Sequence, residues 1–142
     1  MKTSDKAVLR IGLDRLSQAL RKGQKTDKAI DLGIALEAML LHGIGRDELS
    51  YRAAVRAATF LGGSADERLG TFKLVRDAYQ LRSSAVHTGK VSEGGKPLAV
   101  EVLRDASITC AALARKLIER GSFPSWESEY VVGTDQQAEA DN

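Results

Sequence analysis

Residues 64–89, SADERLGTFKLVRDAYQLRSSAVHTG, carry the helix signals that indicate the fold most clearly. Ser64 and Glu67 have the S-x-x-E spacing of a capping box, which predicts that a helix begins here. Gly89 is a typical helix terminator, so the helix is expected to end near His87. Between these ends, apolar side chains recur at helical spacing and predict one packing face: Leu69, Phe72, Val75, Tyr79 and Val86.

The sequence before this stretch predicts further helices. The first is expected over about residues 5–22, ended by Gly23, and its leucines recur at spacings of three and four to give one packing face: Leu9, Leu13, Leu16 and Leu20. A second helix is expected to begin near Thr26 or Asp27, both acceptable caps. Because it is apolar nearly all round, we expect it to be the central helix of the fold.

The remaining helices are predicted from their ends. A third is expected over 47–61, capped by Asp47, and Pro97 fits the first turn of a fifth helix. Ser125 can cap a short sixth helix over 126–131, with Trp126 packed against the bundle. No strand-like alternation of any length interrupts these patterns.

These patterns together predict an all-α, single-domain bundle of about five helices plus a short C-terminal helix, occupying residues 1–132. The last stretch, 133–142, is polar and mildly acidic, and is expected to be a disordered tail.

Composition narrows the class of protein. At 142 residues the chain is long enough for one domain with a real apolar core, and its net charge of +2 is too small to argue for nucleic acid on electrostatics alone. One cysteine and two histidines make a metal site unexpected, and no cofactor is predicted. Cys110 lies in an apolar run and is expected to be buried. With neither a signal peptide nor a membrane span in the pattern, we expect a cytoplasmic protein without membrane contact.

The chemistry on offer is concentrated at Arg82 and His87. On an ideal helix five residues separate side chains by about 140° and about 7.5 Å of rise, so the two are not expected to bond to each other directly. They can flank one small anion if the helix loosens at His87. A guanidinium holds phosphate while an imidazole near a helix C-terminus moves protons close to neutral pH. These two groups are sufficient for metal-independent cleavage of RNA, because the 2′-hydroxyl of RNA provides the nucleophile. The alternative is that Arg82 pairs with Glu37 or a helix end and His87 merely caps its helix.

The chain also resembles a known family. Arg82–His87 matches the signature of the HEPN superfamily, an arginine, four residues and a histidine. The wider stretch Tyr79–Gly89, with Ala35–Leu40 and Glu48–Arg52 upstream, resembles the Apea-like branch in particular. The resemblance covers about residues 27–90.

The resemblance implies a metal-independent RNA endonuclease in a toxin–antitoxin, phage-defence or RNA-processing context. Such proteins typically form homodimers in which two Arg/His pairs line one cleft, and a toxin of this kind would have a cognate antitoxin or other partner protein. Arg82 would steady the scissile phosphate, and His87 from each protomer would supply general base and general acid.

Four further residues complete the expected site. Ser83, Glu37 and Tyr79 lie within the resembling blocks, and Arg52 shares a helix face with Arg56 that can touch phosphates; all four are expected to bind substrate or support the site. Active family members often carry Asn, Asp or His where this chain has Ser83. The alternative function is therefore a non-catalytic HEPN module that binds RNA, a nucleotide or a partner protein.

Overall fold

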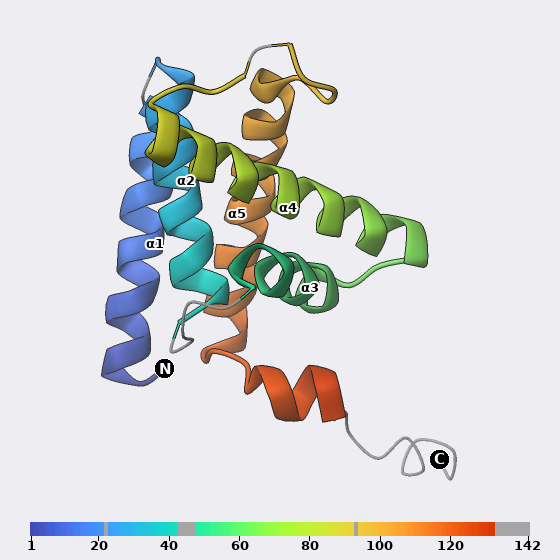
Figure 1. Cartoon of the computed structure of the whole chain (residues 1–142). Helices are drawn as coiled ribbons and strands as arrows, with labels where there is room; N and C mark the ends of the chain where they lie inside the picture. Colours follow the sequence, from blue (N-terminus) through green and yellow to red (C-terminus); the bar gives the residue numbers. More distant parts are fainter. Residues whose placement is uncertain (22, 43–47, 93, 133–142) are drawn as a thin grey trace, which may run out of the picture.

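The computed structural model describes residues 1–21, 23–42, 48–92 and 94–132, which form an all-helical bundle (Figure 1). In chain order the elements are α1 (Thr3–Arg21), α2 (Lys25–Leu40), α3 (Leu49–Leu61), α4 (Ala65–Thr88), α5 (Ala99–Arg120) and a short π-helical segment, η1 (Ser128–Val132). No strand occurs within the described ranges. The predicted all-α class is confirmed, and the tail predicted over 133–142 lies outside the described residues.

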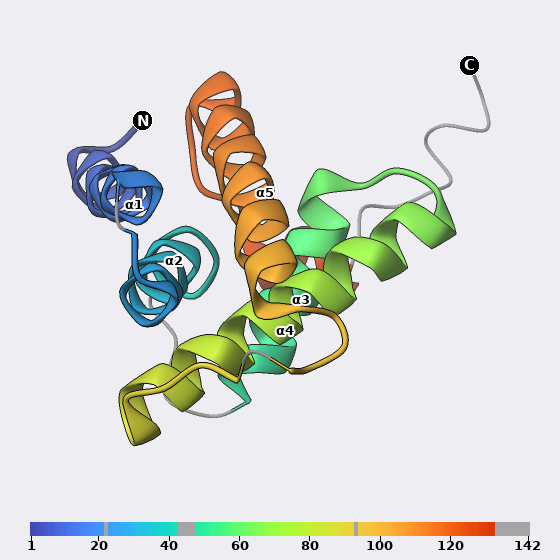
Figure 2. The same ribbon diagram turned by 90° about the horizontal axis from the view of Figure 1, so that it is seen from above.

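α2 is the central helix, as its apolar circumference predicts. It packs against α1, α4 and α5 and also reaches α3 (Figures 1 and 2). Buried residues lie on most of its circumference: Ala29, Asp31, Leu32, Gly33, Ala35, Leu36, Met39 and Leu40. The buried carboxylate of Asp31 accepts a hydrogen bond from Arg15 of α1 at 3.1 Å, which offsets the cost of removing its charge from water.

α1 packs on α2 through a face that includes only two of the four leucines predicted for it, Leu9 and Leu16. The buried residues are Leu9, Gly12, Leu16 and Ala19, whereas Leu13 and Leu20 are exposed, so that part of the prediction is wrong. Small residues bring the two helices close together. A Cβ atom on Gly12 would lie 2.9 Å from Cε of Met39, so the helix presents Gly12 to α2.

The two ends of α4 follow their local signals. The Ser64 hydroxyl oxygen accepts a hydrogen bond from the Glu67 N–H at 3.1 Å, and the Glu67 carboxylate accepts one from the Ser64 N–H at 3.2 Å. Gly89 takes the left-handed conformation, with φ of 70°, and its N–H donates to the Ala85 carbonyl at 3.0 Å. The predicted capping box and glycine stop are both confirmed.

The packing of α4 differs from the prediction near its ends. Its N-terminal half lies beside α3 and its C-terminal half beside α2 (Figure 2). Val75, Ala78, Tyr79 and Ala85 are buried there. Leu69 and Val86, however, are 49% and 53% exposed, because they lie toward the ends of a helix that is covered mainly along its middle. The prediction that these two side chains pack in the core is wrong.

Two helix starts also differ from expectation. α3 begins at Leu49 after Glu48, whose φ is 53°, and the predicted cap at Asp47 lies outside the described residues. α5 begins at Ala99, so the placement of Pro97 in its first turn is wrong. The residue after the proline, Leu98, has extended backbone, with φ −64° and ψ 139°, and acts as the N-cap.

The core beneath α5 holds the single cysteine and the single tryptophan. Cys110 is buried as expected, and burial raises the pKa of its thiol to about 12, which keeps it protonated and unreactive at neutral pH. Trp126 is also buried and packs edge-on against Phe60, with 5.6 Å between ring centroids. Its predicted packing against the bundle is confirmed.

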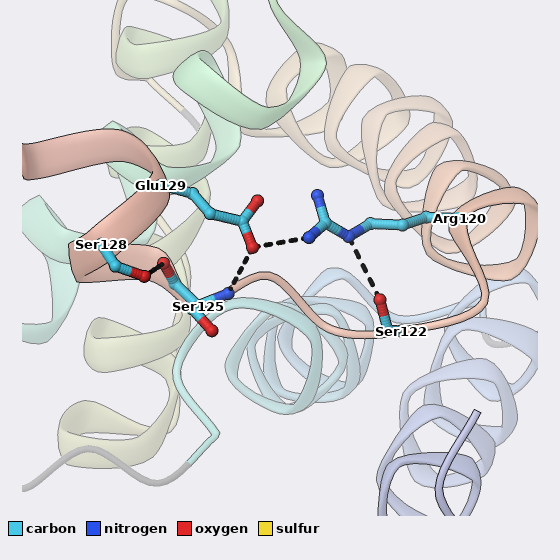
Figure 3. Close-up of polar contacts among 5 residues, drawn as sticks. All are labelled: Arg120, Ser122, Ser125, Ser128 and Glu129. Carbon is cyan, nitrogen blue, oxygen red and sulfur yellow. Dashed lines mark hydrogen bonds and ion pairs between the residues drawn. The ribbon is translucent and has the colours of Figure 1, made fainter. Parts of the chain in front are cut away.

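Polar contacts fasten η1 to the end of α5 (Figure 3). The Glu129 carboxylate accepts hydrogen bonds from the Arg120 guanidinium at 2.6 Å and from the Ser125 N–H at 2.9 Å. The Ser128 hydroxyl donates to the Ser125 carbonyl at 3.2 Å. Ser125 thus makes its described bonds through its main chain. The side-chain cap predicted for it is wrong, because the Glu129 N–H donates to the Ser125 carbonyl, at 2.9 Å, and not to its hydroxyl.

Candidate functional site

The arginine and histidine singled out by the sequence both lie in the C-terminal part of α4, in different environments. Arg82 is half-buried, with 27% of its side chain exposed, and contacts α2. His87 is exposed in the last turn of the helix. Arg82 and His87 form neither a hydrogen bond nor an ion pair with each other, which agrees with the wide angle between positions five apart on one helix.

Glu37, Tyr79 and Arg82 form a cluster between α2 and α4. The Tyr79 hydroxyl donates a hydrogen bond to Oε1 of Glu37 at 2.7 Å. The same oxygen lies 3.3 Å from a terminal nitrogen of Arg82, and the guanidinium lies 5.5 Å from the centroid of the Tyr79 ring. The alternative in which Arg82 pairs with Glu37 is therefore confirmed. The cluster holds the Arg82 head group in one orientation.

Gly33 on α2 is a fourth member of this cluster, and sequence reasoning missed it. A Cβ atom built on Gly33 would collide with Cγ of Arg82 and lie 2.7 Å from its Cβ. The absence of a side chain at Gly33 therefore leaves room for the aliphatic part of Arg82 to cross α2 and reach Glu37. A signal was present in the sequence, because Gly33 lies inside an apolar helix, one turn before Glu37, where a glycine costs about 1 kcal/mol of stability relative to alanine.

The electrostatics of the cluster keep Tyr79 neutral. Burial, followed by the hydrogen bond to Glu37, raises the pKa of the Tyr79 hydroxyl to about 12. It therefore remains a hydrogen-bond donor across the physiological range. The Nε donor of Arg82, by contrast, is buried without a hydrogen-bond partner among the described residues. Orphaned donors of this kind are uncommon in packed interiors and recur at functional sites.

His87 has no structural role in ending its helix. At this end of α4 the Gly89 N–H donates to the Ala85 carbonyl, and the Thr88 hydroxyl donates to the Ser84 carbonyl at 2.8 Å. In the part of the chain that the structure describes, the His87 imidazole makes neither a hydrogen bond nor an ion pair. The alternative that His87 merely caps α4 is wrong, and the imidazole is left open to solvent.

The other predicted site residues lie in two places. Ser83 is half-buried on α4, next to Arg82 in sequence. Arg52 lies on α3 and lines a separate cavity with Arg56 and Trp126. The structure brings Glu37, Tyr79 and Arg82 together and gives Arg52 no contact with them.

The described residues contain no group of three or more His, Cys, Asp or Glu side chains that could hold a metal ion. Among them, too, no helix combines the length and the apolar character needed to cross a bilayer. The chain matches no protein-family model, and no similar curated protein or solved structure was found.

Proposed function

We propose that this chain is a metal-independent RNA endonuclease of the HEPN type, acting as a homodimer in the cytoplasm. The observation that carries the proposal is the presence, on one helix, of an arginine held in a fixed orientation and an exposed histidine that makes no hydrogen bond or ion pair within the described residues. Both lie near the C-terminal end of α4. A toxin, defence or RNA-processing role, with a cognate antitoxin or other partner protein, belongs to the same proposal.

Arg82 is the phosphate-binding group of the proposed site. Glu37 forms an ion pair with one of its terminal nitrogens and Tyr79 lies beside its face, so less of its rotational freedom is lost when a phosphate binds. A guanidinium placed in advance stabilises the negative charge that develops on the phosphate oxygens in the transition state.

His87 supplies the proton transfers. One imidazole takes the proton from the 2′-hydroxyl, whose oxygen attacks phosphorus. The bond from phosphorus to the 5′-oxygen breaks, and that oxygen receives a proton from a second imidazole. The products are a 2′,3′-cyclic phosphate and a 5′-hydroxyl. The His87 of a second protomer provides the second imidazole, and exposed Val86 beside it is an apolar contact for such a partner.

One observation favours the second candidate function, a non-catalytic module that binds RNA, a nucleotide or a protein. Glu37 neutralises much of the charge of Arg82, which weakens its attraction for phosphate. Ser83 is also shorter than the Asn, Asp or His that active members of the resembled family often carry after the arginine.

Cleavage of single-stranded RNA in the presence of a chelator tests the proposal. We expect wild type to release 2′,3′-cyclic phosphate ends, and His87→Ala to lower the rate by about 10²-fold or more, the usual worth of a general acid or base. His42→Ala is the matched control, because His42 is the other histidine of the chain and is also exposed.

The nuclease proposal is overturned if RNA stays intact after incubation with wild type, or if His87→Ala cleaves RNA as fast as wild type does. RNA binding without cleavage would instead support the non-catalytic module.

A further inference from the structure

The cavity that Arg52 lines has a volume of about 460 Å³ and opens between α3 and the C-terminal segment. Three aromatic residues and two arginines dominate its lining, with one carboxylate: Tyr51, Trp126, Tyr130, Arg52, Arg56 and Glu127. No residue of the Glu37–Tyr79–Arg82 cluster lines it. Its size is that of a small-molecule site, and the combination of rings and positive charge is that of a site for a base and its phosphate.

The two arginines have different roles. Arg56 is committed to the fold, since it donates to the Leu40 carbonyl at the end of α2 at 2.8 Å and lies 5.2 Å from the Trp126 ring centroid. Burial and the nearby positive charge of Arg52 both lower the pKa of Arg56, while Glu127 opposes them. The guanidinium of Arg52 makes no hydrogen bond or ion pair within the ranges that the structure describes. Arg52 is therefore the group available to an anion.

The aromatic residues that line the cavity are restrained by contacts with neighbouring side chains. Trp126 contacts Tyr130, with 5.7 Å between ring centroids, and the contacts of Glu129 fasten this segment to α5 (Figure 3). Tyr51, on the α3 side, is 59% exposed and is steadied edge-on by Phe72 at 5.8 Å. An exposed ring that cannot move far is a good stacking platform, because little conformational freedom is lost on binding.

We propose that this cavity binds one nucleotide of a single-stranded RNA, with its base stacked on Tyr51 and its phosphate on Arg52. Since RNA is the substrate under the proposed function, on which this inference rests, the cavity is an accessory site. It holds the strand at a distance from the residues that cleave it. Removing Arg52 or Tyr51 therefore weakens RNA binding and raises KM while kcat stays close to that of wild type.

Fluorescence of Trp126 provides the test, because it is the only tryptophan in the chain and lines the cavity. A short oligouridylate is titrated into the His87→Ala protein, so that bound RNA is not cut. We expect a saturable change in emission, and about tenfold weaker binding when Arg52→Ala or Tyr51→Ala is added. Arg10→Ala, an exposed arginine on α1, is the matched control and is expected to bind as the parent does. Thermal unfolding of each variant shows that the fold is kept.

The inference is overturned if emission does not respond, if Arg52→Ala binds as tightly as Arg10→Ala, or if uridine monophosphate alone binds as tightly as the oligouridylate. The last result would mark a site for free nucleotides. The proposed function is tested separately, by RNA cleavage with the wild-type protein. If RNA binds through Arg52 but the wild type does not cleave it, the cavity is still an RNA-binding site and the nuclease proposal fails.

Discussion

At the scale of single residues, Gly33 determines whether Arg82 can reach Glu37. Gly33→Ala places a methyl group where the arginine stem now runs, so the side chain must leave its path and its ion pair. We expect a loss of about 1–3 kcal/mol in the free energy of unfolding, the usual cost of overpacking. Urea denaturation measures it.

Gly70→Ala is the matched control for this substitution. Gly70 is also a helical glycine, but it is exposed, and nothing lies within 4 Å of the position of its added Cβ. We expect it to stabilise the protein by about 0.5–1 kcal/mol, because alanine is the better helix former. If Gly33→Ala were also stabilising, the packing of Arg82 across Gly33 would be refuted.

Tyr79 makes the stability of the Glu37–Tyr79–Arg82 cluster depend on pH in the alkaline range. Its pKa in the folded state, about 12, lies above its ordinary value of 10.0, so the neutral hydroxyl contributes stability that is complete below pH 10. This contribution is lost as pH rises through 12. We expect the free energy of unfolding of wild type, relative to that of Tyr79→Phe, to decrease as the pH rises from about 10 to about 12. Parallel pH profiles for the two proteins would show that the hydroxyl is not buried against Glu37.

At the scale of elements, the carboxylate of Glu129 accepts the hydrogen bonds that tie the C-terminal segment to the end of α5. Hydrogen bonds from Arg120 and from the Ser125 N–H hold the pKa of Glu129 below its ordinary value of 4.5. Its stabilising effect is therefore present above that value and is lost as pH falls through the lower pKa of the folded state.

Acid should accordingly release η1 from α5 before the bundle unfolds. We expect Trp126 emission to change below about pH 4.5, where carboxylates begin to protonate, while far-UV circular dichroism is retained. Glu129→Gln should abolish this early step, and Glu119→Gln, on exposed α5 surface, should leave it unchanged. An emission change that survives in Glu129→Gln would locate its cause elsewhere.

At the scale of the whole molecule, the proposed nuclease requires two chains. Val86 is 53% exposed next to His87, and a charge there would oppose burial against a partner. We expect Val86→Glu to be monomeric and inactive but folded. Leu69→Glu is the matched control, because Leu69 is 49% exposed toward the other end of the same helix. Light scattering of both variants measures their mass, and a dimeric Val86→Glu would exclude this surface as the interface.

The sequence by itself determined the features that depend on neighbouring residues. The capping box at Ser64 and Glu67, the stop at Gly89 and the central position of an all-round apolar α2 all follow from local hydrogen bonding and hydrophobic pattern. The Arg82 and His87 positions near one helix end followed from the same boundaries.

Only the tertiary structure decided which side chains are buried and which polar groups meet. Leu13 and Leu20 are exposed because Gly12 and Ala19 allow α1 to approach α2 closely. The Glu37–Arg82 pair joins two residues that are far apart in the sequence. It forms because Gly33, which has no side chain, leaves room for the Arg82 side chain to cross α2. Helix boundaries are local hydrogen-bonding events, whereas burial and ion pairing depend on how whole helices fit together, and that fit is fixed only when all of them are packed.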